Sequence, residues 1–346
     1  MPTSRPSILS LLKGEHLSPA PAFSGLSHVL ATGLASEGLE FSEVHGDAGK
    51  MARAAAATFQ LTGLPSAAVP FDLCVEAEAL GSTVDFLAGS TFDFPRIPTP
   101  PFKTSEVLLE ALQTSDVFLR SSRPGSSFED IRSLARIPII CEAISQLKRE
   151  IGADAVIGGI LAGPFTVLST LVENTALYGE MKRQPQLITG CLFHLSSFIA
   201  RVGHAYREAG ADFLTVHEMG GSPTLLGAKY FEQFVFPSLK ELARSLPPPR
   251  VLAVCGNLNE VPALLGAVGA DALSIDQSND LASLRRFLPD ALLFGNLDPV
   301  GLLSGGVPEE IRFAVRKAVH DGADGVWPGC DLVPATPPEN IHALMT

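Results

Sequence analysis

Short apolar runs recur along the chain, and longer stretches with apolar and charged residues at helical spacing separate them. Four of these runs follow the tripeptide Gly-Ala-Asp, which occurs at 152–154, 210–212, 269–271 and 322–324. Glycine suits the left-handed residue that ends a helix, and an unbroken run of about four to seven apolar residues is typical of a strand buried on both faces. Each junction therefore predicts a helix end followed by a parallel strand.

Strands and helices are predicted to alternate regularly. Strands start near residues 212, 250, 271, 291 and 324, and helical spacing marks 138–150, 185–209, 228–245, 259–268, 279–287 and 307–321. This order fits a closed (β/α)₈ barrel or an open doubly wound sheet. Because no G-x-G-x-x-G fingerprint follows the first strand, the dinucleotide-binding sheet is disfavoured. We predict an α/β fold, a (β/α)₈ TIM barrel.

The barrel is expected to form one domain over residues 1–346, because no stretch of the chain resembles a linker. The first 65 residues are rich in Ala, Ser and Gly. We predict that they form an N-terminal helical extension that closes one end of the barrel.

Composition narrows the function classes. Of the 346 residues, 46% are hydrophobic and 18% charged, which excludes a disordered chain. The net charge of −12 and the lack of a basic block argue against nucleic-acid binding. No apolar run approaches a membrane span, and the N-terminus lacks a signal-peptide pattern. Five scattered cysteines do not make a disulfide framework, so we expect a cytoplasmic protein.

Reacting groups in a (β/α)₈ barrel sit where strands end and the following loops begin. In this chain the rule selects His217, Glu218, Cys255, Asn257, Asp276, Asn296, Asp298, Cys330 and Asp331. The earlier segment 70–81 adds Asp72, Cys74, Glu76 and Glu78. We expect these polar side chains to gather at one rim of the barrel.

Cys255 and Cys330, with His217 and Glu218 beside them, are the ligand types that zinc prefers. Their spacing lacks a C-x₂-C, and an isolated cysteine is commonly a small buried hydrophobe, so a structural role stays open. Cys141 and Cys191 lie in predicted helices and are expected in the core. His217 could equally be a hydrogen-bonded structural histidine, Asp276 a helix cap, and Asp298 part of a turn before proline.

Seven segments, in order, resemble landmarks of the uroporphyrinogen decarboxylase superfamily, specifically its methylcobamide:thiol (coenzyme M) methyltransferase branch. They are VPFDLCVEAEALG (69–81), GGILAGPFTVLSTLV (158–172), FEQFVFPSLKEL (231–242), VCGN (254–257), GADALSID (269–276), GNLDPVGLL (295–303) and PGCDLVPATPPENI (328–341). The resemblance covers about residues 7–345 and implies a (β/α)₈ barrel. The Arg-rich N-terminal segment with its Gln-Ala-Gly-Arg signature, typical of the decarboxylase itself, is absent from this chain.

In that branch, zinc is held by a His-x-Cys on one strand and a cysteine after the last strand. The resemblance carries these ligands over to Cys255 and Cys330, but Ala253 stands where the histidine belongs. Our hypothesis is that His217, or failing that Glu218, supplies the missing ligand, since their strand should adjoin the strand of Cys255.

The resemblance implies a corrinoid-dependent methyltransferase, in which a zinc-bound thiolate attacks the methyl group of a methyl-corrinoid on a partner protein and releases Co(I). Candidate catalytic residues are Glu76, Asp276 and Asn257, and candidate cofactor-binding residues are Asn296 and Asp298. One alternative is a metal-free decarboxylase or lyase that uses Asp276 and Glu76. Another, suggested by Ala253, is a non-catalytic relative that binds a corrinoid protein. The methyl donor, the acceptor, the direction of transfer and the oligomeric state stay open.

Overall fold

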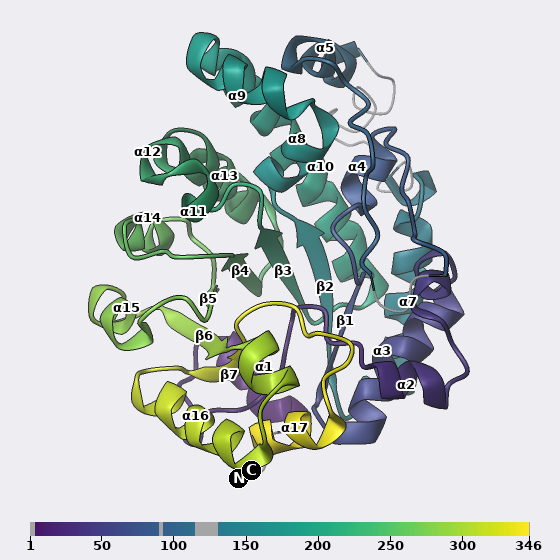
Figure 1. Cartoon of the computed structure of the whole chain (residues 1–346), viewed down its shortest axis with the longest axis vertical. Coiled ribbons are helices and arrows are strands. Elements are labelled where there is room, and N and C mark those ends of the chain that lie inside the picture. Colours follow the sequence, from purple (N-terminus) through teal and green to yellow (C-terminus); the bar gives the residue numbers. More distant parts are fainter. Residues whose placement is uncertain (1–3, 90–92, 115–130, 346) are drawn as a thin grey trace.

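Seven parallel strands form one sheet in a computed structural model of the chain, which describes residues 4–89, 93–114 and 131–345. In chain order they are β1 (Ser66–Val69), β2 (Val156–Ala162), β3 (Phe213–Glu218), β4 (Arg250–Val254), β5 (Ala272–Ile275), β6 (Leu292–Leu297) and β7 (Gly325–Pro328). Each strand pairs with the next one along the chain. Helices surround this sheet (Figure 1), so the predicted parallel α/β fold is confirmed.

The N-terminal segment 21–28 takes the place where an eighth strand was expected. Hydrogen bonds tie it to both edge strands: Phe23 N donates to Val326 O, Val326 N to Pro21 O, and Ser24 N to Ser66 Oγ. Ala22 makes a single parallel bridge with Val326, and no regular strand forms among the described residues of this segment. Pro21 lacks an N–H for a ladder, and Gly25 lies so near β3 that an added Cβ would be 2.4 Å from the Phe213 ring.

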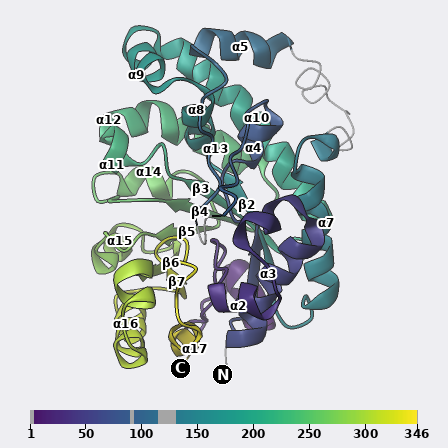
Figure 2. The ribbon, with the colours of Figure 1, turned by 45° about the vertical axis from the view of Figure 1, so that its right-hand side comes forward.

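Three α-helices precede β1, as the predicted N-terminal extension requires: α1 (Arg5–Leu12), α2 (Ala31–Ser36) and α3 (Ala48–Thr62). Only α1 seals an end of the barrel, through Ile8 and Leu11, which pack with the aromatic core inside the sheet. Figures 1 and 2 both place α2 and α3 on the outside, beside α7. The expectation that the whole extension closes one end does not hold for α2 and α3, because α3 packs against α7 and β1 and α2 packs against α3.

Each of the six predicted helical stretches contains a helix. The described helices that follow β1 are α4 (Val75–Ala79), α5 (Ser105–Thr114), α7 (Ile137–Glu150), α8 (Pro164–Leu171), α9 (Asn174–Arg183), α10 (Pro185–Ala209), α11 (Pro223–Leu226), α12 (Ala228–Tyr230), α13 (Phe236–Ser245), α14 (Pro262–Gly266), α15 (Leu281–Phe287), α16 (Pro308–His320) and α17 (Pro338–His342). Of these, α4, α5, α8, α9, α11 and α17 are helices that the sequence did not predict. Short 3₁₀ or π turns lie at Phe41–Gly46, Ile131–Ser133, Phe231–Val235, Pro299–Ser304 and Ala343–Met345. The helix predicted at 259–268 is shorter than expected, because it begins only at Pro262. In the described ranges, no helix is both long and apolar enough to cross a bilayer.

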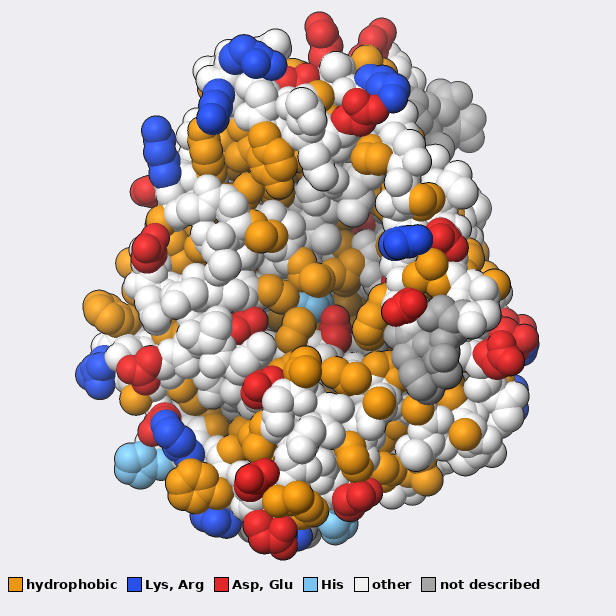
Figure 3. All heavy atoms as spheres, in the orientation of Figure 1, with side chains coloured by type: hydrophobic (Ala, Val, Ile, Leu, Met, Phe, Trp, Pro, Cys, Tyr) orange, Lys and Arg blue, Asp and Glu red, His pale blue; other side chains and the backbone are white. Residues whose placement is uncertain are grey.

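Aromatic side chains fill the amino-terminal half of the barrel. Phe23 lies between Phe213, Phe294 and Trp327, with ring centroids 5.0 to 6.2 Å apart. The face seen in Figure 3 is hollowed at its centre, with hydrophobic side chains around the hollow, acidic side chains near it and a histidine inside.

The Gly-Ala-Asp junctions turn the chain from helix to strand. Gly210, Gly269 and Gly322 have φ of 116°, 87° and 108°, so three of the four glycines are left-handed as predicted. Gly152 does not have a positive φ, which corrects the prediction there. An added Cβ at Gly152 would lie 2.3 Å from Lys148 O, so this glycine is needed for a close backbone approach.

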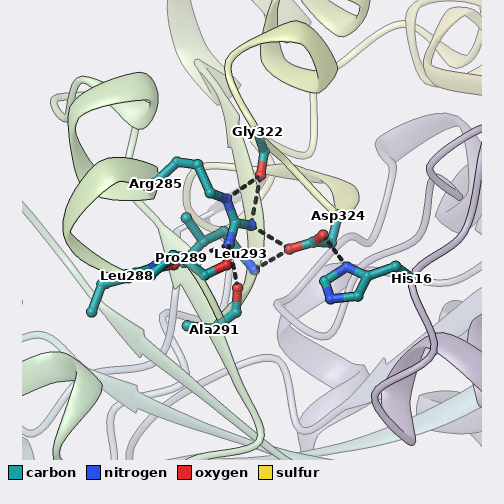
Figure 4. A network of polar contacts seen from close by, with 8 residues as sticks. All are labelled: His16, Arg285, Leu288, Pro289, Ala291, Leu293, Gly322 and Asp324. Carbon is teal, nitrogen blue, oxygen red and sulfur yellow. Dashed lines mark hydrogen bonds and ion pairs between the residues drawn. The ribbon is translucent and has the colours of Figure 1, made fainter.

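The aspartates of these junctions bind the amino ends of the strands. Three of the four accept a backbone N–H from the strand before their own: Asp212 from Ile157, Asp271 from Arg250, and Asp324 from Leu293. The fourth, Asp154, is exposed. Each of the first three also pairs with a cation, as Figure 4 shows for Asp324 with Arg285 and His16. The repeated tripeptide thus builds a set of satisfied ion pairs at the amino end of the barrel.

Candidate metal site at the carboxyl ends of the strands

Three metal-ligating side chains converge where β3, β4 and β7 end. His217 lies near the end of β3, Cys255 follows β4, and Cys330 follows β7. His217 Nε2 is 3.1 Å from Cys255 Sγ and 4.0 Å from Cys330 Sγ, and the two sulfurs are 3.8 Å apart. The imidazole is buried and the two thiols are half-buried. Within the described residues, this is the one such group of three His, Cys, Asp or Glu side chains.

These distances fit a tetrahedral zinc ion. With Zn–S near 2.3 Å and Zn–N near 2.0 Å, tetrahedral ligands lie about 3.5 to 3.8 Å from one another. The observed separations of 3.1, 3.8 and 4.0 Å bracket these values, so small side-chain rotations bring all three atoms to ligand positions. Three protein ligands leave a fourth position for a substrate, as in catalytic zinc sites.

Strand register explains how His217 reaches the two cysteines. His217 of β3 is the direct partner of Ala253 of β4. Paired residues on neighbouring strands point to the same face of a sheet, and the strands lie about 4.8 Å apart. An imidazole on residue 217 therefore reaches the space that a histidine at residue 253 would use. Ala253 itself is buried and leaves that space free.

The three groups form a strongly coupled acid–base cluster. Burial would lower the pKa of His217, but the negative charges of Asp331 and Cys330 outweigh it and raise that pKa to about 9. The hydrogen bond shared with Cys255 lowers the pKa of Cys330 to about 4, whereas the same bond and burial raise the pKa of Cys255. An ionised thiol beside a cationic imidazole is thus favoured, and any bound metal cation would displace the remaining protons.

Asp331 lies behind the imidazole. Its Oδ2 atom is 3.6 Å from His217 Nδ1, and its Oδ1 atom accepts a hydrogen bond from Ser27 N at 2.8 Å. Burial raises the pKa of Asp331 to about 6. Sequence reasoning placed Asp331 in the turn after the last strand without assigning it a role; its position directly after Cys330 was the available signal.

Glu218, the second candidate for the missing ligand, is engaged elsewhere. Its carboxylate is buried and accepts hydrogen bonds from Phe165 N, Thr166 N, Thr166 Oγ1 and Gly221 N. Three of these donors belong to the first turn of α8, where a carboxylate is also favoured by the helix dipole. Burial nevertheless raises the pKa of Glu218. Because Glu218 caps α8 and is absent from the group of converging ligands, His217 is the better candidate.

Asp276 and Asn257 border the cysteine that follows β4. Asp276 accepts hydrogen bonds from Gly256 N at 3.0 Å and from Ser278 N at 2.7 Å. The carboxylate therefore holds the backbone beside Cys255. Asn257 is exposed, and its Oδ1 atom accepts a hydrogen bond from Asn259 N. Both residues lie at the predicted rim, and their contacts shape the loop after β4.

The two candidate cofactor-binding residues lie in and after β6. Asn296 Nδ2 donates to Asn279 O at 3.0 Å, which ties β6 to the loop after β5. Asp298 Oδ1 accepts from Val300 N and Gly301 N and so caps the π turn Pro299–Ser304. Both side chains are half-buried at the same end of the barrel as His217.

A second buried polar cluster surrounds α4. Arg136 donates to Asp72 at 2.9 and 3.0 Å and to Glu78 at 2.5 Å, and His45 Nδ1 lies 3.1 Å from Asp72. Burial would raise the pKa of Asp72, but the hydrogen bonds from His45 and Arg136 lower it strongly. These charges satisfy one another, so the cluster holds α4 in place.

Glu76, also on α4, lacks a cationic partner of this kind. Its side chain is 1% exposed, and its Oε1 atom accepts a hydrogen bond from Ala162 N at the end of β2. Burial raises the pKa of Glu76 to about 7. Glu76 can therefore hold or release a proton near neutral pH.

The other three cysteines are structural. Cys141 in α7 and Cys191 in α10 are buried, as predicted, and burial raises the pKa of both thiols. Cys74 is also buried, and its thiol donates to Pro95 O. Only Cys255 and Cys330 are partly accessible among the five cysteines of the chain, all of which lie in described ranges.

Comparisons with known proteins agree with this geometry. The uroporphyrinogen decarboxylase (URO-D) family pattern matches residues 3–346. The methylcobamide:CoM methyltransferase MtbA of Methanosarcina acetivorans is 27% identical, over 99% of this chain and 96% of that protein. A methylated-thiol–coenzyme M methyltransferase of Methanosarcina mazei is 26% identical, over 99% of this chain and 88% of its own. The solved structure of a methyltransferase from Methanosarcina mazei superposes with a TM-score of 0.87 at 27% identity, covering 97% of this chain and 95% of that one.

Proposed function

The chain belongs to the uroporphyrinogen decarboxylase (URO-D) family, and on that premise we propose that it is a corrinoid-dependent methyltransferase. It moves a methyl group between a methyl-corrinoid, carried by a partner protein, and a small thiol. The observation that carries the proposal is the convergence of His217, Cys255 and Cys330 at the carboxyl ends of three strands. The similarity to proteins named methylcobamide:CoM and methylated-thiol methyltransferases supports the same class of reaction.

His217, Cys255 and Cys330 would hold a zinc ion, and three protein ligands leave the fourth position open. Bound zinc would supply Lewis acidity that keeps a substrate thiol in its thiolate form near neutral pH, where a free thiol is mostly protonated. The two cysteine ligands contribute negative charge to the site, which leaves a substrate sulfur more nucleophilic. In the transfer, the thiolate sulfur forms a bond to the methyl carbon, and the cobalt–carbon bond breaks with its electron pair left on cobalt as Co(I).

The surrounding residues position the reactants. Asp276 fixes the backbone next to Cys255 through Gly256 N, and Asn257 lies exposed just beyond. Asn296 and Asp298 are the residues that we assign to the corrinoid side of the rim. Glu76 is the buried acid that can exchange a proton with a bound thiol or product near neutral pH.

The decisive experiment is demethylation of methylcobalamin with a panel of small thiols, followed through the corrinoid absorption spectrum. Zinc-loaded wild type should transfer the methyl group, whereas chelator-treated protein and Cys255→Ala/Cys330→Ala should not. Cys191→Ala is the matched control, because it removes a thiol that is buried in α10 and is not one of the three converging ligands. The proposal would be rejected if zinc-loaded wild type demethylated methylcobalamin with none of the thiols.

Two other outcomes identify the alternatives. Decarboxylase or lyase activity that survives chelation and is lost in Glu76→Gln or Asp276→Asn would indicate metal-free acid–base chemistry. Capture of a corrinoid protein without methyl turnover would indicate a non-catalytic binding protein.

A further inference from the structure

We propose that Asp331 is a positioning residue that fixes the ring of His217 and directs its Nε2 atom to the metal. This inference rests on the proposed metal site, but it concerns a contact that the metal ligands do not make themselves. The Nδ1 atom of His217 is buried and has no hydrogen-bond partner, and the nearest carboxylate oxygen is Asp331 Oδ2 at 3.6 Å. No cation other than the imidazole faces this oxygen in the contacts of the described residues.

The chemistry of metal-bound histidine explains the need for such a partner. An imidazole that ligates through Nε2 must carry its proton on Nδ1, and a carboxylate that accepts this proton selects that tautomer. The separation of 3.6 Å is longer than a hydrogen bond, so a small rotation of either side chain must close it.

Asp331 is itself held from the other side. Ser27 N donates to Asp331 Oδ1 at 2.8 Å, and Leu332 N donates to Ser27 O at 2.8 Å. Ser27 belongs to segment 21–28, which lies between the two edge strands. The irregular segment that stands in for an eighth strand therefore orients the carboxylate that orients His217.

Two substitutions of Asp331 distinguish this role from a purely structural one, because the two roles predict opposite orders of zinc affinity. In Asp331→Asn, the amide oxygen can keep the bond from Ser27 N, which turns the amide N–H₂ toward His217 Nδ1. A donor at that position requires Nδ1 to be an acceptor and puts the ring proton on Nε2, where it blocks the metal. In Asp331→Ala, the Ser27 bond is lost, but neither tautomer is imposed.

The test measures zinc affinity by competition with a chromophoric chelator, together with thermal unfolding. We expect Asp331→Ala to weaken zinc binding by about 10- to 100-fold, the usual effect of removing such a partner. Asp331→Asn should bind zinc more weakly than Asp331→Ala, although it should unfold at the higher temperature of the two. Asp47→Asn, at the N-cap of α3, is the matched control and should bind zinc like wild type.

A second readout observes the ring directly. In the zinc-loaded wild type, nuclear magnetic resonance should detect a His217 Nδ1–H proton that exchanges slowly with water, and this signal should be lost in both variants. An Asp331→Asn affinity equal to or tighter than that of Asp331→Ala would overturn the proposal, because Asp331 would then act only through Ser27. A wild type that binds zinc but transfers no methyl group would reject the proposed function and leave the order of affinities as an independent test. A wild type that binds no zinc would reject both.

Discussion

The two ends of the barrel are built from the same repeated units, yet they use their polar residues in opposite ways. At the amino end, Asp212, Asp271 and Asp324 each accept a strand N–H and pair with a cation. At the carboxyl end, His217 Nδ1 has no hydrogen-bond partner, and the two thiols lie beside each other and the imidazole. The polar groups of the amino end thus bind one another, whereas the imidazole and thiols of the carboxyl end can bind an added ligand.

This difference follows from where the chain turns. Four helix-to-strand turns at the amino end are short and repeat one tripeptide, and in three of them the aspartate binds a neighbouring strand. Strand-to-helix turns at the carboxyl end differ in length and sequence, which lets each one carry a different functional group. Substitutions at the amino end should therefore change stability, and those at the carboxyl end should change binding.

The largest expected effect is the loss of the imidazole at the carboxyl end. His217→Ala should weaken zinc binding at least about 1,000-fold, or about 4 kcal/mol, because two thiolates alone hold the metal poorly. Adding Ala253→His should restore the affinity to within about tenfold of wild type, since residue 253 is the register partner of residue 217. Chelator competition measures both effects.

Two controls test this move of the histidine ligand from residue 217 to residue 253. Ala253→His alone puts a second imidazole beside His217 in one ligand position, so zinc should bind no more tightly than in wild type. Because residues 217 and 253 are both buried, each change should lower the unfolding free energy of the metal-free protein by about 1 to 3 kcal/mol, and zinc affinity is compared at a temperature where every variant is folded. If the double variant binds zinc no better than His217→Ala, the two positions do not share one ligand site.

The next effect belongs to the amino end. Asp324→Ala removes the carboxylate partner of Arg285 and the side-chain acceptor of Leu293 N, and the Asp324 side chain is 13% exposed. We expect the free energy of unfolding to fall by about 3 kcal/mol, as for other largely buried pairs that lose one member. Urea unfolding measures this loss, and zinc affinity should stay at the wild-type value. Glu309→Ala, which breaks an exposed pair with Arg312, is the control and should change stability by less than about 0.5 kcal/mol.

Glu76 should make stability depend on pH near the carboxyl end. Its pKa is about 7 in the folded protein, against an ordinary value of 4.5. Between these values the unfolded chain releases the proton and the folded protein keeps it, so stability falls as pH rises. From pH 5 to pH 7 this group should remove about 2 kcal/mol from the free energy of unfolding. Glu76→Gln should abolish that part of the pH dependence, and equal slopes in the two proteins would contradict the assignment.

Many features of the two ends could be predicted from the sequence, because short local patterns specify them. The Gly-Ala-Asp junctions mark where three helices end and strands begin, and adjacent strands bring His217 near Cys255. Neither conclusion needs more than the order of the elements and the rule that parallel strands end at one rim.

The rest depends on contacts between distant parts of the chain. Segment 21–28 begins with a proline and has no strand pattern, so its place between β1 and β7 is set by tertiary hydrogen bonds and by the packing of Phe23. Glu218 directly follows His217, yet α8 supplies the donors that occupy it, and no spacing in the sequence reveals this. The 3.6 Å approach of Asp331 to His217 likewise depends on how the loop after β7 meets β3.

The smallest expected effect tests whether burial, rather than pairing itself, makes the amino end stable. His16 Nδ1 lies 2.8 Å from Asp324, the same carboxylate that binds Arg285, but the His16 side chain is 61% exposed. Solvent screens such a pair, so His16→Ala should lower the free energy of unfolding by less than about 0.5 kcal/mol. The loss should be several times smaller than that of Asp324→Ala in the same urea titration. A loss from His16→Ala as large as that from Asp324→Ala would mean that the exposed contact holds α1 and the loop before β7 together, and that pairing at this end matters more than burial.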